Sequence, residues 1–180
     1  MALKSTIYKA DCQIADMDRG YYHDHHLTLA LHPSETEERM MVRLLAFIIH
    51  ADENLHFTKG LSSDDEPDLW QKSLTDEIDV WIDVGMPDDK RIRKACHRAK
   101  QVYVYTYGGR NSLWWQQIQH KLERFTNLTV VNLPKADTDA LMPLVKRTMH
   151  LQISLQDGQL WLSDEHQNAT VKPDTWLSAA

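Results

Sequence analysis

The sequence is poor in the features that define secreted, membrane and metal-cluster proteins. It has only two cysteines, Cys12 and Cys96, which lie far apart and outside any metal-ligand spacing, so reduced thiols are expected. No apolar stretch follows Lys4, so no signal peptide is expected. No apolar run approaches the roughly 18–20 residues that cross a membrane. Together these absences predict a cytoplasmic protein with no membrane partner.

Positive charge is also scarce. Lysine and arginine number 20 against 26 acidic residues, a formal net charge of −6. Proteins that bind nucleic acid without sequence preference are usually basic, so a broad surface of this kind is not expected, although a local basic patch is compatible with the composition. The chain also has no Gly-rich phosphate loop, nucleophile elbow or Cys-His pair. Nucleotide hydrolysis by a P-loop and acyl transfer by a serine triad therefore lack support.

What the sequence does contain is enough apolar material for a core. The 180 residues are 42% hydrophobic, and no internal repeat, low-complexity segment or linker divides them. The composition therefore predicts a single domain over residues 1–180.

Alternating patterns predict a β-hairpin near each end of the chain. Residues 5–15 and 21–31 flank a turn cluster, and residues 151–155 and 160–162 flank Asp157-Gly158, which is a typical hairpin turn. A last strand is expected near residues 168–172. After the first hairpin, Ser34 and Glu37 have the spacing of a capping box, which predicts a helix over residues 35–52.

Strands and helices mix in the middle of the chain. The expected strands are 55–59, 69–70, 78–84, 102–107 and 128–133, with an acidic loop at 62–68; the expected helices are 87–100, 111–126 and 136–147. A short connection between strands implies an antiparallel pair, and a helix between strands implies a parallel pair. The pattern predicts an α/β fold with one mixed, twisted sheet flanked by helices.

Two aspartates in this region are candidates for a metal site. A hairpin would place Asp68 and Asp83 side by side on neighbouring strands. Two converging carboxylates suit a hard divalent ion such as Mg²⁺, which can orient a phosphate and activate a water. The alternative is a loop-capping aspartate and a solvated strand residue.

Pro67-Asp68, followed by Asp83 at a strand end, a helix and a strand, resembles the PD-(D/E)XK nuclease core. Over nearly its whole length the chain resembles the YaeQ family, a group of bacterial proteins assigned a variant of that fold. The strings that carry this resemblance are Met1 to Ala10, His32-Pro33-Ser34-Glu35-Thr36, Glu38-Arg39-Met40-Met41, Asp64-Asp65-Glu66-Pro67, Trp81-Ile82-Asp83-Val84-Gly85 and Leu162-Ser163-Asp164.

The resemblance implies an αβββαβ nuclease-like core with added N- and C-terminal hairpins. It implies Mg²⁺ held by Asp68 and Asp83, with Glu38 on the first helix as a third ligand. The nuclease pattern also places a lysine two residues after the second acidic residue, where this chain has Gly85.

A cation from the next helix could replace that lysine. The candidates are Lys90, Arg91 and Lys94; Arg91 borders the buried face of the helix, and Lys94 has the longer flexible reach. Arg91 and Lys94 are the candidates for charge stabilisation in catalysis. Alternatively, the cation is absent and the fold persists without the activity.

Three further features have a functional and a plain interpretation. The basic helix 87–100 is either a phosphate-facing surface or a solvated face. His23 and His25 share a strand face and could begin a metal site, or are surface histidines near a turn. Trp114 and Trp115 could stack on bases, although their helical spacing with Ile118 favours the core.

Three functions remain open from the sequence. The first is Mg²⁺-dependent hydrolysis of nucleic acid. The second is a catalytically inactive nuclease-fold protein that binds nucleic acid or protein, which would suit the suspected link of the family to transcription elongation. The third is a protein–protein adaptor without nucleic-acid contact, which the net acidity favours.

Overall fold

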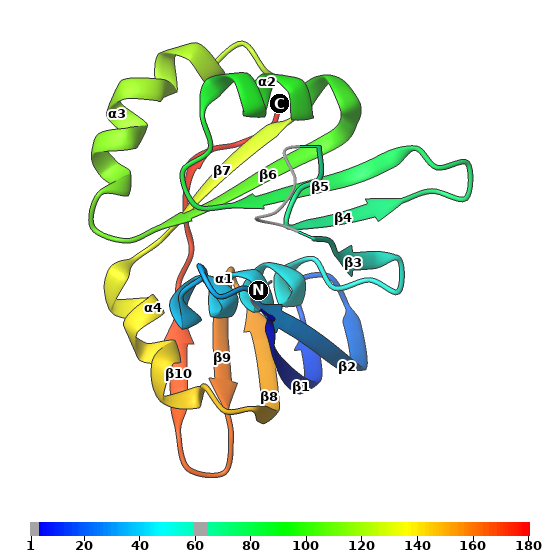
Figure 1. The fold of residues 1–180 in the computed structure, drawn as a ribbon, viewed down its shortest axis with the longest axis vertical. Coiled ribbons are helices and arrows are strands. Elements are labelled where there is room, and N and C mark those ends of the chain that lie inside the picture. The colour runs from blue at the N-terminus through cyan, green and yellow to red at the C-terminus, as the bar shows by residue number, and fades with distance from the viewer. Residues whose placement is uncertain (1–3, 60–64) are drawn as a thin grey trace. The chain divides into compact units, whose positions relative to one another are not determined.

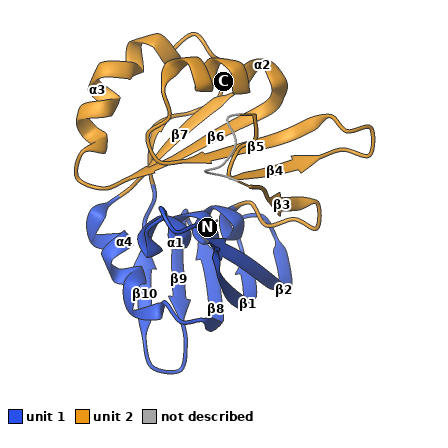
Figure 2. Cartoon of the chain, viewed as in Figure 1, with its two compact units in different colours: residues 1–49, 134–173 blue, residues 50–133, 174–180 orange. Residues whose placement is uncertain are grey.

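The computed structural model describes residues 4–59 and 65–180, and these divide into two compact units. Unit 1 consists of residues 1–49 and 134–173, and unit 2 of residues 50–133 and 174–180 (Figures 1 and 2). The mixed α/β class is confirmed. The expectation of one sheet extended by two hairpins is wrong, because each unit has a mixed sheet of its own. The single domain over residues 1–180 stays a prediction.

Unit 1 contains a five-stranded sheet in the order β10-β9-β8-β1-β2. Its strands are β1 (Thr6–Asp16), β2 (Tyr21–Leu31), β8 (Thr148–Gln156), β9 (Gln159–Ser163) and β10 (Asn168–Val171). Both predicted terminal hairpins form, β1 with β2 and β8 with β9. The two hairpins join through a parallel pairing of β1 with β8, so they make one sheet together instead of extending the other one.

One face of this sheet packs against helices, and the other carries exposed polar side chains. Alternate residues of β1, including Ala10, Cys12 and Ile14, are buried, as are Met149 and Leu151 of β8. The helices of unit 1 are α1 (Glu37–Ile49), α4 (Lys135–Leu141) and the short 3₁₀ helix η2 (Met142–Leu144). Burial of alternate strand residues is what one helix-covered face requires.

Unit 2 contains a six-stranded sheet in the order β11-β7-β6-β5-β4-β3. Its strands are β3 (Leu55–Phe57), β4 (Leu69–Lys72), β5 (Ile78–Val84), β6 (Ala99–Tyr107), β7 (Leu128–Leu133) and β11 (Asp174–Leu177). Strands β3, β4 and β5 are antiparallel neighbours, and β5, β6 and β7 are parallel. The antiparallel and parallel pairings expected from the connections are therefore present.

Helices α2 (Asp89–Arg98) and α3 (Asn111–Leu122) cover one face of this sheet (Figure 1). Ile92 and Ala95 of α2 and Ile118 of α3 pack with Trp81 and Val104 of the strands. The helix N-terminus of α2 is capped by Asp88, whose Oδ1 accepts a hydrogen bond from the Arg91 amide at 2.8 Å. This packing fixes which side chains of α2 turn toward the sheet.

Among the described residues, no helix is both long and apolar enough to cross a bilayer.

Candidate functional site

Asp68 and Asp83 lie side by side, as the sequence predicted. Leu69 of β4 pairs with Ile82 of β5, and the Asp68 amide donates to the Ile82 carbonyl at 3.0 Å. The next position of this antiparallel register therefore sets Asp68 opposite Asp83. Both aspartates are buried, at 4% and 2% exposure. A carboxylate buried this deeply needs a compensating partner.

Arg91 of α2 is the partner of Asp83. Its Nε lies 2.9 Å from Asp83 Oδ2 and its Nη2 lies 3.0 Å from Oδ1, so the guanidinium engages both carboxylate oxygens. Nη2 also donates to the Glu66 carbonyl at 2.8 Å. Bidentate arginine–carboxylate pairs are the strongest of the common ion pairs. The chain has Gly85 where the motif has its lysine, and of the three candidate replacements Arg91 is the one that contacts Asp83.

Asp68 is also held by hydrogen bonding. Its Oδ2 accepts the Val84 amide at 2.8 Å, at the end of β5. A buried carboxylate that accepts a backbone N–H clamps two strands together. This interaction gives Asp68 a structural role that the Asp68-Asp83 spacing alone does not reveal.

The arrangement as it stands does not fit a divalent ion. Both oxygens of Asp83 face the Arg91 guanidinium, and a metal would have to displace that cation. Within residues 4–59 and 65–180, no group of three or more His, Cys, Asp or Glu side chains has a geometry that could hold a metal. Asp83 is therefore neutralised by an arginine, and Asp68 is held by a backbone hydrogen bond.

Glu38 lies in unit 1, on α1, whereas Asp68 and Asp83 lie in unit 2. The buried carboxylate near the start of α1 is Glu35, which sequence reasoning missed. Glu35 binds Arg43 at 2.7 Å through Oε1 and accepts from Arg39 at 2.7 Å through Oε2. The sequence signal was the four-residue spacing of Glu35 and Arg39 within the predicted helix 35–52, although in the structure Glu35 lies two residues before α1 begins.

Lys94 does not reach Asp83 but forms an ion pair with Asp65 at 3.2 Å on the surface. Arg98, one turn further, donates to the Asp65 carbonyl at 2.7 Å, and its guanidinium lies 5.1 Å from the Trp81 ring centre. Sequence reasoning missed this role of Arg98, although its position seven residues after Arg91 places both on one helix face. Residues 62–64 of the predicted acidic loop lie outside the described residues.

The solvent-facing side of α2, away from the buried Ile92 and Ala95, presents three exposed basic side chains, Lys90, Arg93 and His97. None of the three has a hydrogen-bond or ion-pair partner in the part of the chain that the structure describes. Their spacing puts them on one face over about 10 Å of helix. This set is called here the α2 basic face.

The remaining sequence candidates have structural roles. The His25 ring packs edge-on against Phe47, with ring centres 5.2 Å apart, and its Nε2 lies 2.7 Å from the Tyr21 hydroxyl. Trp114 donates through Nε1 to the Pro87 carbonyl at 3.1 Å, and Trp115 lies 5.7 Å from the Trp176 ring. For the tryptophans these contacts support the plain interpretation, whereas His25 is half-buried against α1 instead of lying on the surface.

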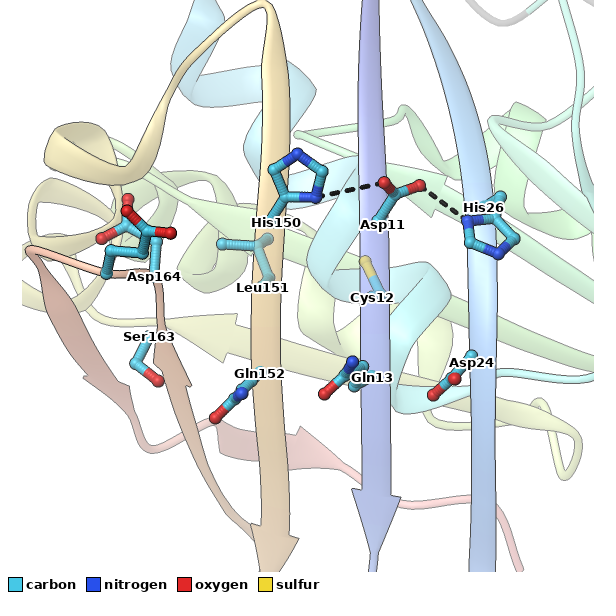
Figure 3. Close-up of a pocket in the computed structure, with 11 residues that line it drawn as sticks. Asp11, Cys12, Gln13, Asp24, His26, His150, Leu151, Gln152, Ser163 and Asp164 are labelled. Carbon is cyan, nitrogen blue, oxygen red and sulfur yellow. Dashed lines mark hydrogen bonds and ion pairs between the residues drawn. The ribbon is translucent and has the colours of Figure 1, made fainter.

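A second polar cluster, absent from the sequence predictions, lies on the exposed face of the unit 1 sheet. There Asp11 of β1 stands between two imidazoles, with His26 Nδ1 at 2.7 Å and His150 Nδ1 at 3.2 Å (Figure 3). They line a hollow of about 290 Å³. The His26 hydrogen bond lowers the pKa of Asp11, and the same bond raises the pKa of His26. No local pattern could reveal a cluster that depends on strands β1 and β8 pairing.

Cys12 also borders this hollow, but it is not a nucleophile. Burial raises the pKa of its thiol to about 12, so it is protonated at neutral pH. Burial likewise raises the pKa of Cys96 to about 11. Neither cysteine offers a reactive thiolate.

The fold and the site define an α/β protein with two mixed sheets, in which one of two adjacent buried aspartates, Asp83, is paired with a helix arginine. The chain belongs to the YaeQ family: the family model described as YaeQ protein matches residues 1–173.

Relatives of known sequence and structure agree with this assignment. The chain is 49% identical over 177 residues to the YaeQ proteins of Escherichia coli (strain K12) and Shigella flexneri, covering 98% of each chain. The crystal structure of the YaeQ protein from Xanthomonas axonopodis pv. citri matches with a TM-score of 0.94 at 46% identity, covering 98% of this chain and 99% of that one. The YaeQ protein from Pseudomonas syringae matches with a TM-score of 0.92 at 33% identity, covering 97% of both chains.

Proposed function

We propose that this protein is a catalytically inactive member of the PD-(D/E)XK nuclease-like fold that binds the backbone of a nucleic acid through the α2 basic face. The observation that carries the proposal is the bidentate pair between Arg91 and Asp83. The Arg91 guanidinium occupies both oxygens of the carboxylate with which a nuclease would bind its metal. Other basic side chains of the same helix remain exposed.

The order of elements supports the nuclease-like part of the proposal. From α1 to β6 the chain runs helix, three antiparallel strands, helix and parallel strand, which is the αβββαβ order. Asp68 and Asp83 occupy the two motif positions of that order. Gly85 stands where the motif has its lysine, and Arg91 supplies a cation from the next helix.

The chemistry of the α2 basic face supports nucleic acid as the ligand. Lys90, Arg93 and His97 follow one line along the helix and are exposed. Because each phosphate contact releases about one counterion, two or three contacts predict weak, salt-sensitive binding with a log–log salt slope of about −2 to −3. The net charge of −6 limits contact to this local patch. A cytoplasmic site of action and a role in transcription elongation belong to the same proposal.

The test is fluorescence anisotropy with labelled single- and double-stranded DNA and RNA at several salt concentrations. The double variant Lys90→Ala/Arg93→Ala should weaken binding about tenfold or more and flatten the salt slope by about 2. The control is Lys135→Ala, which removes one exposed charge from α4 of unit 1. Equal binding by the double variant and the wild type would contradict the α2 basic face. Absence of binding to every nucleic acid would favour a protein partner instead.

The second candidate function is the Mg²⁺-dependent nuclease. What favours it is the adjacency of Asp68 and Asp83, with a helix cation in contact with Asp83. It requires Arg91 to release Asp83 first. Isothermal titration with Mn²⁺ and cleavage assays on the same nucleic acids test it. Metal binding and cleavage that Asp83→Asn abolishes would establish this candidate and overturn the inactive one.

A further inference from the structure

The edges of the two sheets differ greatly in length. Among the described strands, the edge strands are β10 with 4 residues, β3 with 3, β11 with 4 and β2 with 11. An edge strand exposes unpaired backbone groups, and proteins usually shield it with a short length, a bulge, proline or lysine. The first three edges are short, whereas β2 is long.

None of these protective devices is present in β2. Its sequence from Tyr21 to Leu31 contains no proline and no lysine, and its register with β1 runs through all 11 positions without a shift. Within the described residues it pairs with no strand other than β1. Its outward-facing side chains, from Tyr22 to Thr28, are exposed. Such an edge is a template for an added strand.

The side chains of β2 show which strand would fit. Even-numbered residues face the exposed side of the sheet, and odd-numbered ones face α1, as the contact of His25 with Phe47 shows. A second β2 related by a two-fold axis through His25 would keep these faces aligned. It would set Asp24 of each copy opposite His26 of the other, about 5 Å apart between Cβ atoms.

Neighbouring two-fold registers are less favourable. An axis through Asp24 sets two carboxylates opposite each other, and an axis through His26 sets two imidazoles opposite each other, and like groups in direct cross-strand pairs are destabilising. The register centred on His25 places two Asp24–His26 pairs across the axis, which carry opposite charges when His26 is protonated. The strand is therefore complementary to itself in one alignment.

We propose that β2 is a self-association edge, through which two copies of this chain pair antiparallel about His25 and join their five-stranded sheets into one. The occupant of the edge is a second copy because the charges of Asp24 and His26 match in that pairing. One strand pair buries little surface, so the dimer is weak and concentration-dependent.

Sedimentation equilibrium of the full chain, from micromolar to near-millimolar concentration, is the first test. We expect a monomer–dimer equilibrium. A monomer at every concentration would overturn the proposal. Dimers whose strength is unchanged by Asp24→Lys would overturn it as well, because they would use another surface.

Paired charge variants test the register itself. Asp24→Lys alone and His26→Glu alone each set like charges opposite each other and should remain monomeric. Mixed together, they place Lys opposite Glu and His opposite Asp, so the mixture should dimerise. Circular dichroism of each variant verifies folding. A mixture that stays monomeric while wild type dimerises would overturn the register.

Cysteine cross-linking gives an independent readout. In the proposed dimer the two copies of residue 25 face each other across the axis, within the range that a disulfide spans. The two copies of Thr28 stand about 20 Å apart. Because Cys12 of β1 is the cross-strand neighbour of residue 25, the variants are made in a Cys12→Ala background. Under mild oxidation His25→Cys should then form covalent dimers and Thr28→Cys should not, with Cys12→Ala alone measuring the background from Cys96. Equal cross-linking of both variants would contradict the proposal.

Discussion

At the residue scale, the central feature is a buried charge that has been given a partner. Asp83 is 2% exposed, and the Arg91 guanidinium covers both of its oxygens. Removing one partner of such a pair leaves an uncompensated charge in the interior, which is far more costly than the pair itself is favourable. Arg91 is therefore a structural residue first, whatever else the site does.

Arg91→Ala should lower the free energy of unfolding by about 2–4 kcal/mol, because Asp83 then remains buried without its cation. Arg93→Ala, which removes an exposed charge from the same helix, should change it by less than about 0.5 kcal/mol. Urea unfolding followed by circular dichroism measures both. Similar values for the two variants would show that the pair contributes little.

The Asp11–His26 contact makes a prediction about pH. The hydrogen bond from His26 lowers the pKa of Asp11 and raises that of His26 from 6.5. The stabilisation that comes from protonated His26 is fully present below the unfolded-state pKa of histidine. It is lost as pH rises through the raised pKa of His26 in the folded protein. The stabilisation that comes from ionised Asp11 is fully present above the unfolded-state pKa of aspartate. It is lost as pH falls through the lowered pKa of Asp11 in the folded protein. The pair is therefore formed between these two limits.

NMR titration of the His26 ring protons measures this directly. In wild type its pKa should lie above 6.5, and Asp11→Asn should return it toward that value because the carboxylate acceptor is lost. A His26 pKa that Asp11→Asn leaves unchanged would mean that the contact is not formed in solution.

At the element scale, the first helix shows how local sequence rules succeed in part. The periodic apolar residues predicted α1, but its start is two residues later than expected. Thr36 caps it, since its Oγ1 accepts the Arg39 amide at 3.1 Å, whereas Ser34 turns to His32 at 2.7 Å. Two hydroxyl residues two positions apart can both begin a helix, and here the later one does.

Thr36→Ala should therefore destabilise the protein by about 1 kcal/mol, as is usual for the loss of a helix cap. Ser34→Ala should change the free energy of unfolding by less than about 0.5 kcal/mol. Thermal or urea unfolding of both variants decides between the two caps. A larger loss for Ser34→Ala would restore the capping box predicted from sequence.

Strands that depend on distant partners were harder to predict than helices. The predicted strands 78–84, from its alternation, and 128–133 match β5 and β7 in their bounds. In contrast, β11 was missed, because Asp174 to Leu177 is only 4 residues long and follows Pro173 directly. The strand is stabilised by backbone hydrogen bonds to β7, and this pairing cannot be predicted from the four residues alone.

At the scale of the whole molecule, the sequence indicated the α/β class, both terminal hairpins and the adjacency of Asp68 and Asp83. It could not indicate the parallel pairing of β1 with β8, because that pairing joins residues about 140 positions apart and leaves no local periodicity. The same long-range pairing brings His150 to Asp11. Likewise, helix wheels placed Arg91 at the border of the buried face, and only the packing of α2 on the sheet aimed it at Asp83.

The measurement that tests the account most directly is an anisotropy titration of labelled nucleic acid with wild type and with Lys90→Ala/Arg93→Ala, in the presence of Mg²⁺. Gel electrophoresis after each titration shows whether the nucleic acid has been cleaved. We expect salt-sensitive binding by wild type, loss of that binding in the double variant, and uncleaved nucleic acid in both. Cleavage that depends on Mg²⁺ and Asp83, or binding that does not depend on Lys90 and Arg93, would contradict it.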